Sequence, residues 1–424
     1  MKSFFDKIFL RSNNLNFVHK IINDLTKKTP AQKIFDSINS YSSDSEIRYV
    51  GGCIRKILNN EKIDDIDLAT NLEPNQVCEA LKLKNINFYE SGISHGTITA
   101  LIDKYKFEIT TLRKDIFSDG RHAKVQYTKS WLEDASRRDF TINSIYSDAN
   151  GNLFDPFNGK KDLEKGIINF IGDADERIKE DYLRILRYLR FFLNYSKHQH
   201  NPDILKKLKI NIGGISKLSK DRLLDELKKI AKVDILENLS RDKVSLDFIL
   251  IIFPELKNLK IFSKLNTYQR DLLKKSDFVF LLSLMIVDEK DNAEYFIYKY
   301  NLSKNDQKRI KIINNFFKKK INLNIFTKNR MNKIFYYDGK QAIIDILNFR
   351  ILKSKKIDPK LVELSELFQD KEIPSIPVGA DLLMSKYKIP EGKILGKKLK
   401  LIEEEWVKNN FQISTKEIDN IIKN

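Results

Sequence analysis

Two aspartates separated by one residue are the first feature of this sequence that could do chemistry. Asp65 and Asp67 lie in a segment, Ile63–Leu68, whose alternation of polar and apolar residues is typical of a β-strand. Successive side chains of a strand point to opposite faces, so both aspartates share one face and apolar Ile66 and Leu68 share the other. Two converging carboxylates favour a divalent cation, and oxygen-only ligands favour Mg²⁺ shared with substrate phosphates. The pair predicts a magnesium site, although a solvated acidic turn has the same pattern.

A predicted strand, Arg48–Val50, runs into two glycines and a short predicted helix, Gly52–Leu58. Gly51 and Gly52 would let backbone N–H groups approach phosphates closely, and Arg55 could add a charge-assisted contact. The junction therefore predicts a phosphate site, while Gly-Gly taken alone also marks an ordinary tight turn.

A hairpin is predicted further along the chain, from strands at Thr97–Ile102 and Tyr105–Leu112. Glu108 is expected on its second strand near the aspartate pair, where it could bind metal or deprotonate a hydroxyl. An exposed strand glutamate without a catalytic role fits the pattern equally well. The following stretch, Arg113–Gln126, has no clear periodicity and is predicted to be a loop.

Paired arginines and an aspartate form the next candidate site, within Ser136–Asn143. Arg138 suits phosphate binding and Asp139 suits recognition of a ribose hydroxyl. A salt bridge between Arg137 or Arg138 and Asp139 at a helix start is the structural alternative.

The stretch Arg177–Arg190 is predicted to be one continuous amphipathic helix. Its charged residues recur every three positions and form a ridge: Asp181, Arg184, Arg187 and Arg190. Asp181 can accept a hydrogen bond from an exocyclic amino group while Arg184 donates to the neighbouring ring nitrogen. Cytosine and adenine both present this pattern, whereas uracil and guanine present a carbonyl and an N–H instead. An ion-pair ladder is the alternative, but three cations for one anion are unbalanced for that purpose.

The composition indicates a polyanionic partner and a reducing compartment. A net charge of +18 over 424 residues favours nucleic acid, although a biased, lysine-rich composition explains part of the charge. The two cysteines, Cys53 and Cys78, are not spaced for zinc or a disulfide framework, which predicts a cytoplasmic protein without zinc. The apolar run Phe278–Val287 is about half of what a bilayer requires, so we expect a buried helix and no membrane partner.

The chain changes character once, near Gly166–Asp173, from short strands to long amphipathic helices. Pro374–Gly379 introduces a distinct tail. We predict five divisions along the chain: an N-terminal helical segment, 1–30; a catalytic head, 31–165; a helical neck carrying the nucleotide-selecting helix, 166–228; a helical body, 229–373; and a tail, 374–424.

The motifs, taken together, resemble one family. They occur in the order found in class II tRNA nucleotidyltransferases and bacterial poly(A) polymerases: Gly51-Gly52-x-x-Arg55, Asp65-x-Asp67, Arg137-Arg138-Asp139-Phe140-Thr141-Ile142-Asn143 and Glu180-Asp181-x-x-Arg184-x-x-Arg187. The match is dense from Tyr49 to Phe192. Pro377–Leu382 is similar to the tail of bacterial CCA-adding relatives, whereas Lys56 replaces an acidic residue that the family usually has.

This resemblance implies an α/β head of the polymerase-β type with a mixed sheet, followed by an all-α neck, body and tail, mostly α overall. It implies the following roles: Asp65 and Asp67 bind Mg²⁺, Gly52, Arg55 and Arg138 contact the nucleotide, Asp181 with Arg184 selects the base, and Arg187 and Arg190 add nucleotide contacts.

The implied activity is addition of C, C and A to the 3′ acceptor end of tRNA from CTP and ATP, with release of pyrophosphate. The segment Asp119–Ala123 resembles the mobile loop that governs the final A addition in relatives. Three alternatives remain open: a poly(A) polymerase, a partial CC- or A-adding enzyme, and an inactive RNA-binding homologue.

Overall fold

A computed structural model of the chain describes residues 15–63, 65–92, 96–118, 123–288, 290–318, 326–354 and 356–423. The chain divides into two compact units, Met1–Glu226 and Leu227–Asn424. All of the predicted site residues belong to the first unit.

The first unit is built on a mixed seven-stranded sheet with the strand order β3-β4-β5-β2-β1-β8-β9. Its strands are β1 (Ile47–Val50), β2 (Ile66–Thr70), β3 (Asn87–Gly92), β4 (Thr97–Ile102), β5 (Tyr105–Thr111), β8 (Tyr146–Ser147) and β9 (Leu153–Phe154). Strands β2 and β5 pair in parallel, whereas the other pairs are antiparallel. The mixed sheet of the head is therefore confirmed, and β2 and β5, which carry predicted carboxylates, are neighbours in it.

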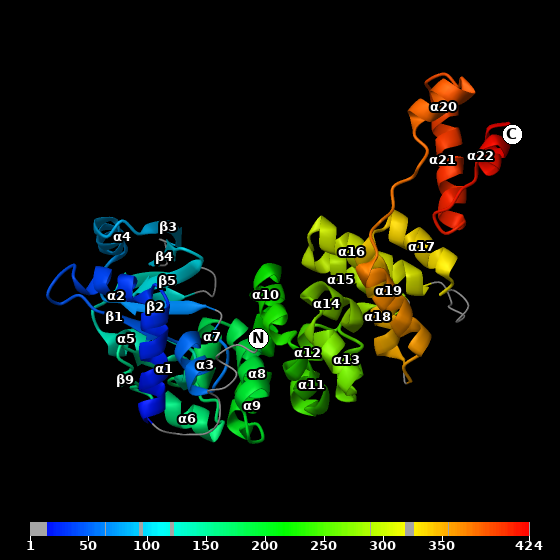
Figure 1. Ribbon diagram of the computed structural model, residues 1–424. Coiled ribbons are helices and arrows are strands. Elements are labelled where there is room, and N and C mark those ends of the chain that lie inside the picture. The colour runs from blue at the N-terminus through cyan, green and yellow to red at the C-terminus, as the bar shows by residue number, and fades with distance from the viewer. Residues whose placement is uncertain are drawn as a thin grey trace. The chain divides into compact units, whose positions relative to one another are not determined.

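Four helices pack beside this sheet (Figure 1) and share its core. They are α1 (Leu15–Lys28), α2 (Ala31–Asn39), α3 (Gly52–Leu58) and α4 (Pro74–Leu83). Helix α1 places Val18 and Ile22 in the same apolar cluster as the strands. The hydroxyl groups of Thr26 and Tyr49 lie 2.9 Å apart, and that of Thr26 also donates to the carbonyl oxygen of Ala149. The described part of the N-terminal segment is thus tied to the head.

A separate two-stranded sheet occupies most of the stretch Arg113–Gln126 that was predicted to be a loop. Strands β6 (Arg113–Ser118) and β7 (Ala123–Tyr127) pair antiparallel, so that prediction is wrong. The pairing rests on backbone hydrogen bonds, and a narrow two-stranded sheet needs little apolar alternation, which explains why no periodicity marked it. Residues 119–122 of the predicted mobile loop lie outside the described residues.

The remaining helices of the first unit alternate with the last strands of the sheet and continue through the predicted neck. They are α5 (Trp131–Ser136), the 3-10 helix η3 (Thr141–Asn143), α6 (Gly159–Lys165), α7 (Ala174–Glu180), α8 (Leu183–Tyr195), α9 (Pro202–Asn211), the 3-10 helix η4 (Ile212–Lys217) and α10 (Lys220–Ile230). A single helix over Arg177–Arg190 is wrong, because the chain is extended at Asp181, with φ −153° and ψ 105°. The Asp181 carboxylate accepts a hydrogen bond from the backbone N–H of Leu183 and so caps α8 instead of continuing α7.

The described residues of the second unit form helices and connecting turns and no strand. The helices are α11 (Val233–Arg241), α12 (Lys243–Ile252), η5 (Leu259–Ser263), α13 (Thr267–Lys274), α14 (Phe278–Ile286), α15 (Asn292–Tyr300), α16 (Lys304–Lys318), α17 (Lys328–Tyr337), α18 (Lys340–Lys353), α19 (Pro359–Asp370), α20 (Ala380–Tyr387), α21 (Lys393–Lys408) and α22 (Thr415–Lys423). Helix α14 is buried from Phe280 onward, which confirms the predicted buried helix. No helix in the described ranges is both long and apolar enough to cross a bilayer.

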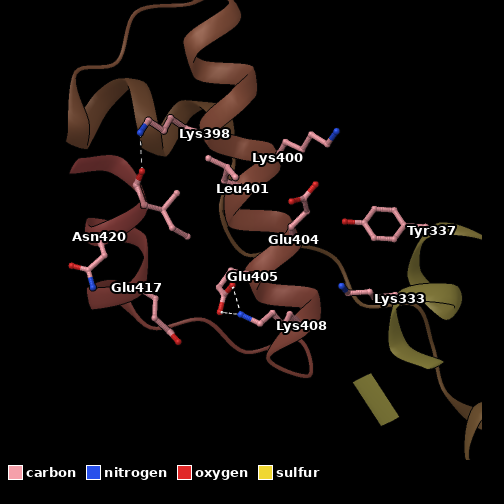
Figure 2. Close-up of a pocket in the computed structure, with 11 residues that line it drawn as sticks. Lys333, Tyr337, Lys398, Lys400, Leu401, Glu404, Glu405, Lys408, Glu417 and Asn420 are labelled. Atoms are coloured by element: carbon pink, nitrogen blue, oxygen red, sulfur yellow. Dashed lines mark hydrogen bonds and ion pairs between the residues drawn. The ribbon is translucent and has the colours of Figure 1, made fainter. Parts of the chain in front are cut away.

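Helices α20 to α22 have an apolar cluster of their own, which includes Leu383 and Ile402. A cavity of about 910 Å³ lies where α17 faces α21 and α22. Figure 2 shows its mixed charge: Lys333 and Tyr337 of α17 point toward α21, which carries Glu404, while Lys408 pairs with Glu405 at 3.0 Å. No predicted site residue lines this cavity, so the candidate site must be sought in the first unit.

Candidate functional site

The two predicted metal ligands lie where β2 begins, beside β5. Asp67 stands in register with Glu108 on the parallel neighbour strand, and exposed Asp65 directly precedes β2. Burial raises the pKa of Asp67, and the carboxylates of Glu108 and Asp65 raise it further, against a smaller opposing effect of Arg138 and Arg55. Three negative groups therefore repel one another around the start of β2, in the middle of the sheet.

This repulsion is what a divalent cation would relieve. Among the described residues, no three His, Cys, Asp or Glu side chains form a ready-made metal cage, and Glu108 bonds to Lys106 at 2.7 Å. Asp64 lies outside the described residues. Two aspartates that leave the remaining positions to substrate phosphates and water are the donor set that Mg²⁺ takes in phosphate chemistry. The residues present thus fit a divalent cation that is completed by the substrate.

The glycine junction between β1 and α3 lies against the carboxylate of Asp67. A methyl group added to Gly52 would lie 3.6 Å from Oδ2 of Asp67 and 3.8 Å from Nη2 of Arg55. Gly51 has φ 65° and ψ −116°, a conformation that residues with a Cβ rarely adopt, and a methyl group there would lie 3.5 Å from Nη1 of Arg138. Bare backbone therefore separates the carboxylates from two guanidinium groups, as a site for phosphates requires.

Arg55 is buried and held by polar partners on later elements. Its Nε donates to the hydroxyl of Tyr195 at 3.2 Å, and its Nη1 donates to Oδ1 of Asn143. Asn143 in turn donates to Oδ1 of Asp139 at 2.8 Å, and Arg187 of α8 donates to Oδ2 of Asp139 at 2.6 Å. A continuous polar chain thus connects the glycine junction with α8. Burial would raise the pKa of Asp139, but Arg187 and the hydrogen bonds lower it overall.

Asp134 was missed by the sequence analysis, although it organises the paired arginines. Its Oδ1 accepts from Arg137 at 2.7 Å, and its Oδ2 accepts from Arg138 at 3.0 Å and from the hydroxyl of Tyr146 at 2.6 Å. Its side chain is 1% exposed. The i,i+3 and i,i+4 spacing of an acid before two arginines was the available signal.

We expect Asp134→Asn to destabilise the protein by about 3 kcal/mol at neutral pH, because it leaves two partly buried guanidiniums without their carboxylate. Burial alone would raise the pKa of Asp134, but Arg138, Arg137 and the Tyr146 hydroxyl hold it below its ordinary 3.8. A lowered folded-state pKa contributes stability that is fully present above 3.8 and is lost as pH falls below it.

Urea titrations of the wild type and the Asn variant at neutral pH and near pH 3 would measure this difference. The difference in the free energy of unfolding should shrink at the lower pH, because the Asp134 carboxyl group of the unfolded wild type takes up a proton below 3.8 while that of the folded protein stays ionised. A difference that stays constant with pH would contradict the ionic role of Asp134.

Of the predicted base-reading residues, Asp181 lies in the break between α7 and α8, and Arg184 lies in the first turn of α8. Arg184 is buried, and its Nη1 donates to Glu180 at 2.6 Å and to the carbonyl oxygen of Arg177 at 2.7 Å. Its Nε and Nη2 make no hydrogen bond to the described residues, so both donors are available to a base. Oδ2 of Asp181 accepts from Arg222 of α10 at 2.7 Å.

The imbalance of three cations and one anion, inferred from sequence spacing, is absent in three dimensions. Each arginine has a carboxylate partner of its own: Arg184 pairs with Glu180, Arg187 with Asp139, and Arg190 with Glu226. Arg190 also lies over the ring of Phe191, 4.1 Å from its centroid. The Arg190 side chain therefore contacts Phe191 of α8 and Glu226 of α10. A contact between Arg190 and the nucleotide remains a prediction.

The chain is similar to known proteins in sequence. Residues 47–169 match the family model described as the poly A polymerase head domain. CCA tRNA nucleotidyltransferase 1, mitochondrial, of Homo sapiens is 35% identical over 395 residues, which cover 89% of this chain and 86% of the human protein. The CCA-adding enzyme of Staphylococcus haemolyticus is 32% identical over 322 residues, which cover 75% of each chain.

Solved structures share the fold. The Bacillus stearothermophilus CCA-adding enzyme in complex with CTP superposes with a TM-score of 0.68 at 20% identity, covering 93% of this chain and 96% of that chain. The Thermotoga maritima CCA-adding enzyme complexed with tRNA_CCA superposes with a TM-score of 0.61 at 18% identity, covering 96% and 98%. An α/β head followed by helices throughout the rest of the chain is the architecture common to these structures and the present one.

Proposed function

Because this chain belongs to the family of CCA-adding tRNA nucleotidyltransferases, we propose that it adds C, C and A to the 3′ end of tRNA from CTP and ATP. The observation that carries the proposal is that the first unit contains both a candidate phosphate site and a candidate base-reading group. One is the Gly51-Gly52 junction beside Asp67, and the other is Arg184, whose Nε and Nη2 are available to a base.

The transfer chemistry is assigned to the carboxylates at the start of β2 and on β5. The 3′-hydroxyl group of the RNA would give its proton to water or to Glu108, and its oxygen would form a bond to the α-phosphorus. The bond between the α-phosphorus and the oxygen that bridges to the β-phosphate breaks, and pyrophosphate leaves. Mg²⁺ held by Asp65 and Asp67 would neutralise the triphosphate and the attacking hydroxyl. Arg55 and Arg138 would bind the phosphates, and the backbone at Gly51 and Gly52 gives those phosphates room. Glu108 would act as a supporting carboxylate.

Choice of nucleotide is assigned to the break between α7 and α8. Asp181 would accept a hydrogen bond from the exocyclic amino group of cytosine or adenine, and Arg184 would donate to the adjacent ring nitrogen. Uracil and guanine would leave both protein groups facing groups of the same polarity, which costs more than the loss of a single hydrogen bond. Asp139 and Arg187, which bond to each other, would contact the ribose and the triphosphate, with Arg190 as a further nucleotide contact.

The deciding experiment supplies tRNA that lacks its 3′ end with CTP, ATP, or both, in Mg²⁺, and sequences the products. We expect two C residues from CTP alone and a single terminal A when ATP is added. Long A tails without C would replace the proposal by a poly(A) polymerase, and a stop after C and C with both nucleotides would indicate a partial CC-adding enzyme. No addition under any condition would favour an inactive RNA-binding homologue.

Two further assignments rest on chemistry rather than on the relatives. Mg²⁺ is proposed because the donor set consists of carboxylate oxygens beside a phosphate site. A cytoplasmic location is proposed from the cysteine usage, and Cys53 and Cys78 are both buried free thiols. Relatives named mitochondrial are among the matches, so the compartment needs direct localisation by microscopy of the tagged protein.

A further inference from the structure

We propose that Arg222 of α10 is a positioning residue for base selection and that it acts through Asp181. The inference rests on the proposed role of Asp181 as the base-reading carboxylate. Nη2 of Arg222 lies 2.7 Å from Oδ2 of Asp181, although 41 residues separate the two in the chain. The side chains of Arg222 and Asp181 are 30% and 20% exposed. The pair is thus partly shielded from water, which strengthens its charge-assisted hydrogen bond.

Asp181 needs an external partner because its own helix does not orient it. The residue is extended between α7 and α8, so neither helix restricts its side chain as a regular turn would. Oδ1 accepts from the backbone N–H of Leu183 at 3.1 Å, which holds only one oxygen. Arg222 holds the second oxygen, and two donors on different elements together set the plane of the carboxylate. Each carboxylate oxygen has a second acceptor site, so Oδ2 can still receive the amino group of a base.

A second contact also connects the break between α7 and α8 with the residues that precede α10. A methyl group added to Gly214 would lie 2.1 Å from ring carbons of Tyr182, so only glycine allows this ring to pack so closely. Lys217 contacts the same ring, with its Nζ 5.4 Å from the centroid of Tyr182. Gly214 and Lys217 belong to η4, which leads directly into α10. The η4–α10 segment therefore contacts both Asp181 and the residue that follows it.

The two base-reading residues are consequently held in the same way. Glu180 orients Arg184 and leaves its Nε and Nη2 available, while Arg222 orients Asp181 and leaves one acceptor site on Oδ2. Removing Arg222 would let the carboxylate rotate about the bond to its β-carbon, because the Leu183 N–H would be its one remaining hydrogen-bond donor among the described residues. The amino group of cytosine would lose its fixed acceptor. The ratio of kcat/KM for CTP to that for UTP would therefore decrease.

The test compares the kcat/KM for CTP with that for UTP on tRNA that lacks its 3′ end, in the full-length protein. We expect Arg222→Gln to lower the CTP/UTP ratio by about tenfold, the effect of one hydrogen bond to a charged group. Arg222→Lys should give an intermediate ratio, since one ammonium can replace the single Nη2 contact. Lys220→Gln is the matched control: it removes one positive charge from an exposed position of the same helix and should leave the ratio unchanged.

A double-mutant cycle separates positioning from a direct contact with the nucleotide. In the Asp181→Ala background, Arg222→Gln should have no further effect on the ratio. A further decrease there would overturn the inference, because Arg222 would then act independently of Asp181. The ratio is taken within one preparation, so a smaller folded fraction cancels, and Arg222→Ala replaces the Gln variant if that variant yields no folded protein.

The outcomes also distinguish this inference from the proposed function. If the wild type adds no C to tRNA, the proposed function fails. If the wild type adds C, C and A while Arg222→Gln keeps the wild-type CTP/UTP ratio, only the role of Arg222 fails.

Discussion

Replacing Asp65 and Asp67 together by alanine is expected to abolish nucleotide addition while RNA binding is retained. Apart from Glu108, which bonds to Lys106, these two carboxylates are the only described protein groups around the start of β2 that suit a divalent cation. Without them the charge on the triphosphate and on the attacking hydroxyl is not neutralised. We expect kcat to fall by about a thousandfold or more.

The measurement is single-turnover extension of tRNA in Mg²⁺, with RNA binding followed by gel mobility shift. The double change makes the protein more basic by two charges, which by itself strengthens contacts with phosphates. Asp36→Ala/Asp44→Ala is therefore the control, because it removes two exposed aspartates from the same unit. A double variant at Asp65 and Asp67 that extends tRNA as fast as the wild type would refute the metal site and support an inactive homologue.

Asp181→Ala is expected to remove most of the discrimination between CTP and UTP. The substitution deletes the acceptor for the exocyclic amino group, while Arg184 stays anchored by Glu180 and by the carbonyl of Arg177. A well-placed pair of hydrogen bonds to a base edge contributes about 1–3 kcal/mol of discrimination, so we expect the CTP/UTP ratio of kcat/KM to fall by about 10- to 100-fold.

Asp221→Ala provides the comparison, since it removes an exposed carboxylate from α10, the helix that carries Arg222. This control should keep the wild-type ratio. Unchanged discrimination in Asp181→Ala would instead show that the base is read elsewhere in the site. A variant that loses all activity with every nucleotide would point to a role of Asp181 in transfer rather than in selection.

Several elements of the head could be predicted from local pattern because local physics determines them. The helix Gly52–Leu58 and the strand Thr97–Ile102 have their predicted bounds. Alternation along β2 also places Ile66 and Leu68 in the core, whereas Asp67 is only partly buried and Asp65, just before the strand, is exposed. Side-chain periodicity is a property of the backbone itself, so it survives folding wherever one face is buried.

Two elements were predicted wrongly, each for an identifiable reason. The hairpin β6–β7 is held by backbone hydrogen bonds and shows no apolar alternation that a sequence pattern could reveal. At Asp181 the spacing of charges continues through Arg190, but a side-chain cap on Leu183 competes with the helix and ends α7. Helical periodicity in a sequence cannot distinguish one helix from two that are joined by a single extended residue.

By itself the sequence determined the chemical types at the site: two aspartates for a cation, glycines beside arginines for phosphates, and an Asp/Arg pair for a base. These follow from residue identity and short-range spacing. Only the tertiary structure decided which partner holds each group: Glu108 stands in register with Asp67, Asp134 clamps Arg138, and Arg222 holds Asp181. The last of these pairs spans 41 residues, and parallel strand pairing is also non-local, so no local pattern encodes either. Long-range contacts form only when the core brings distant segments together, and they orient charges whose identity the sequence already contains.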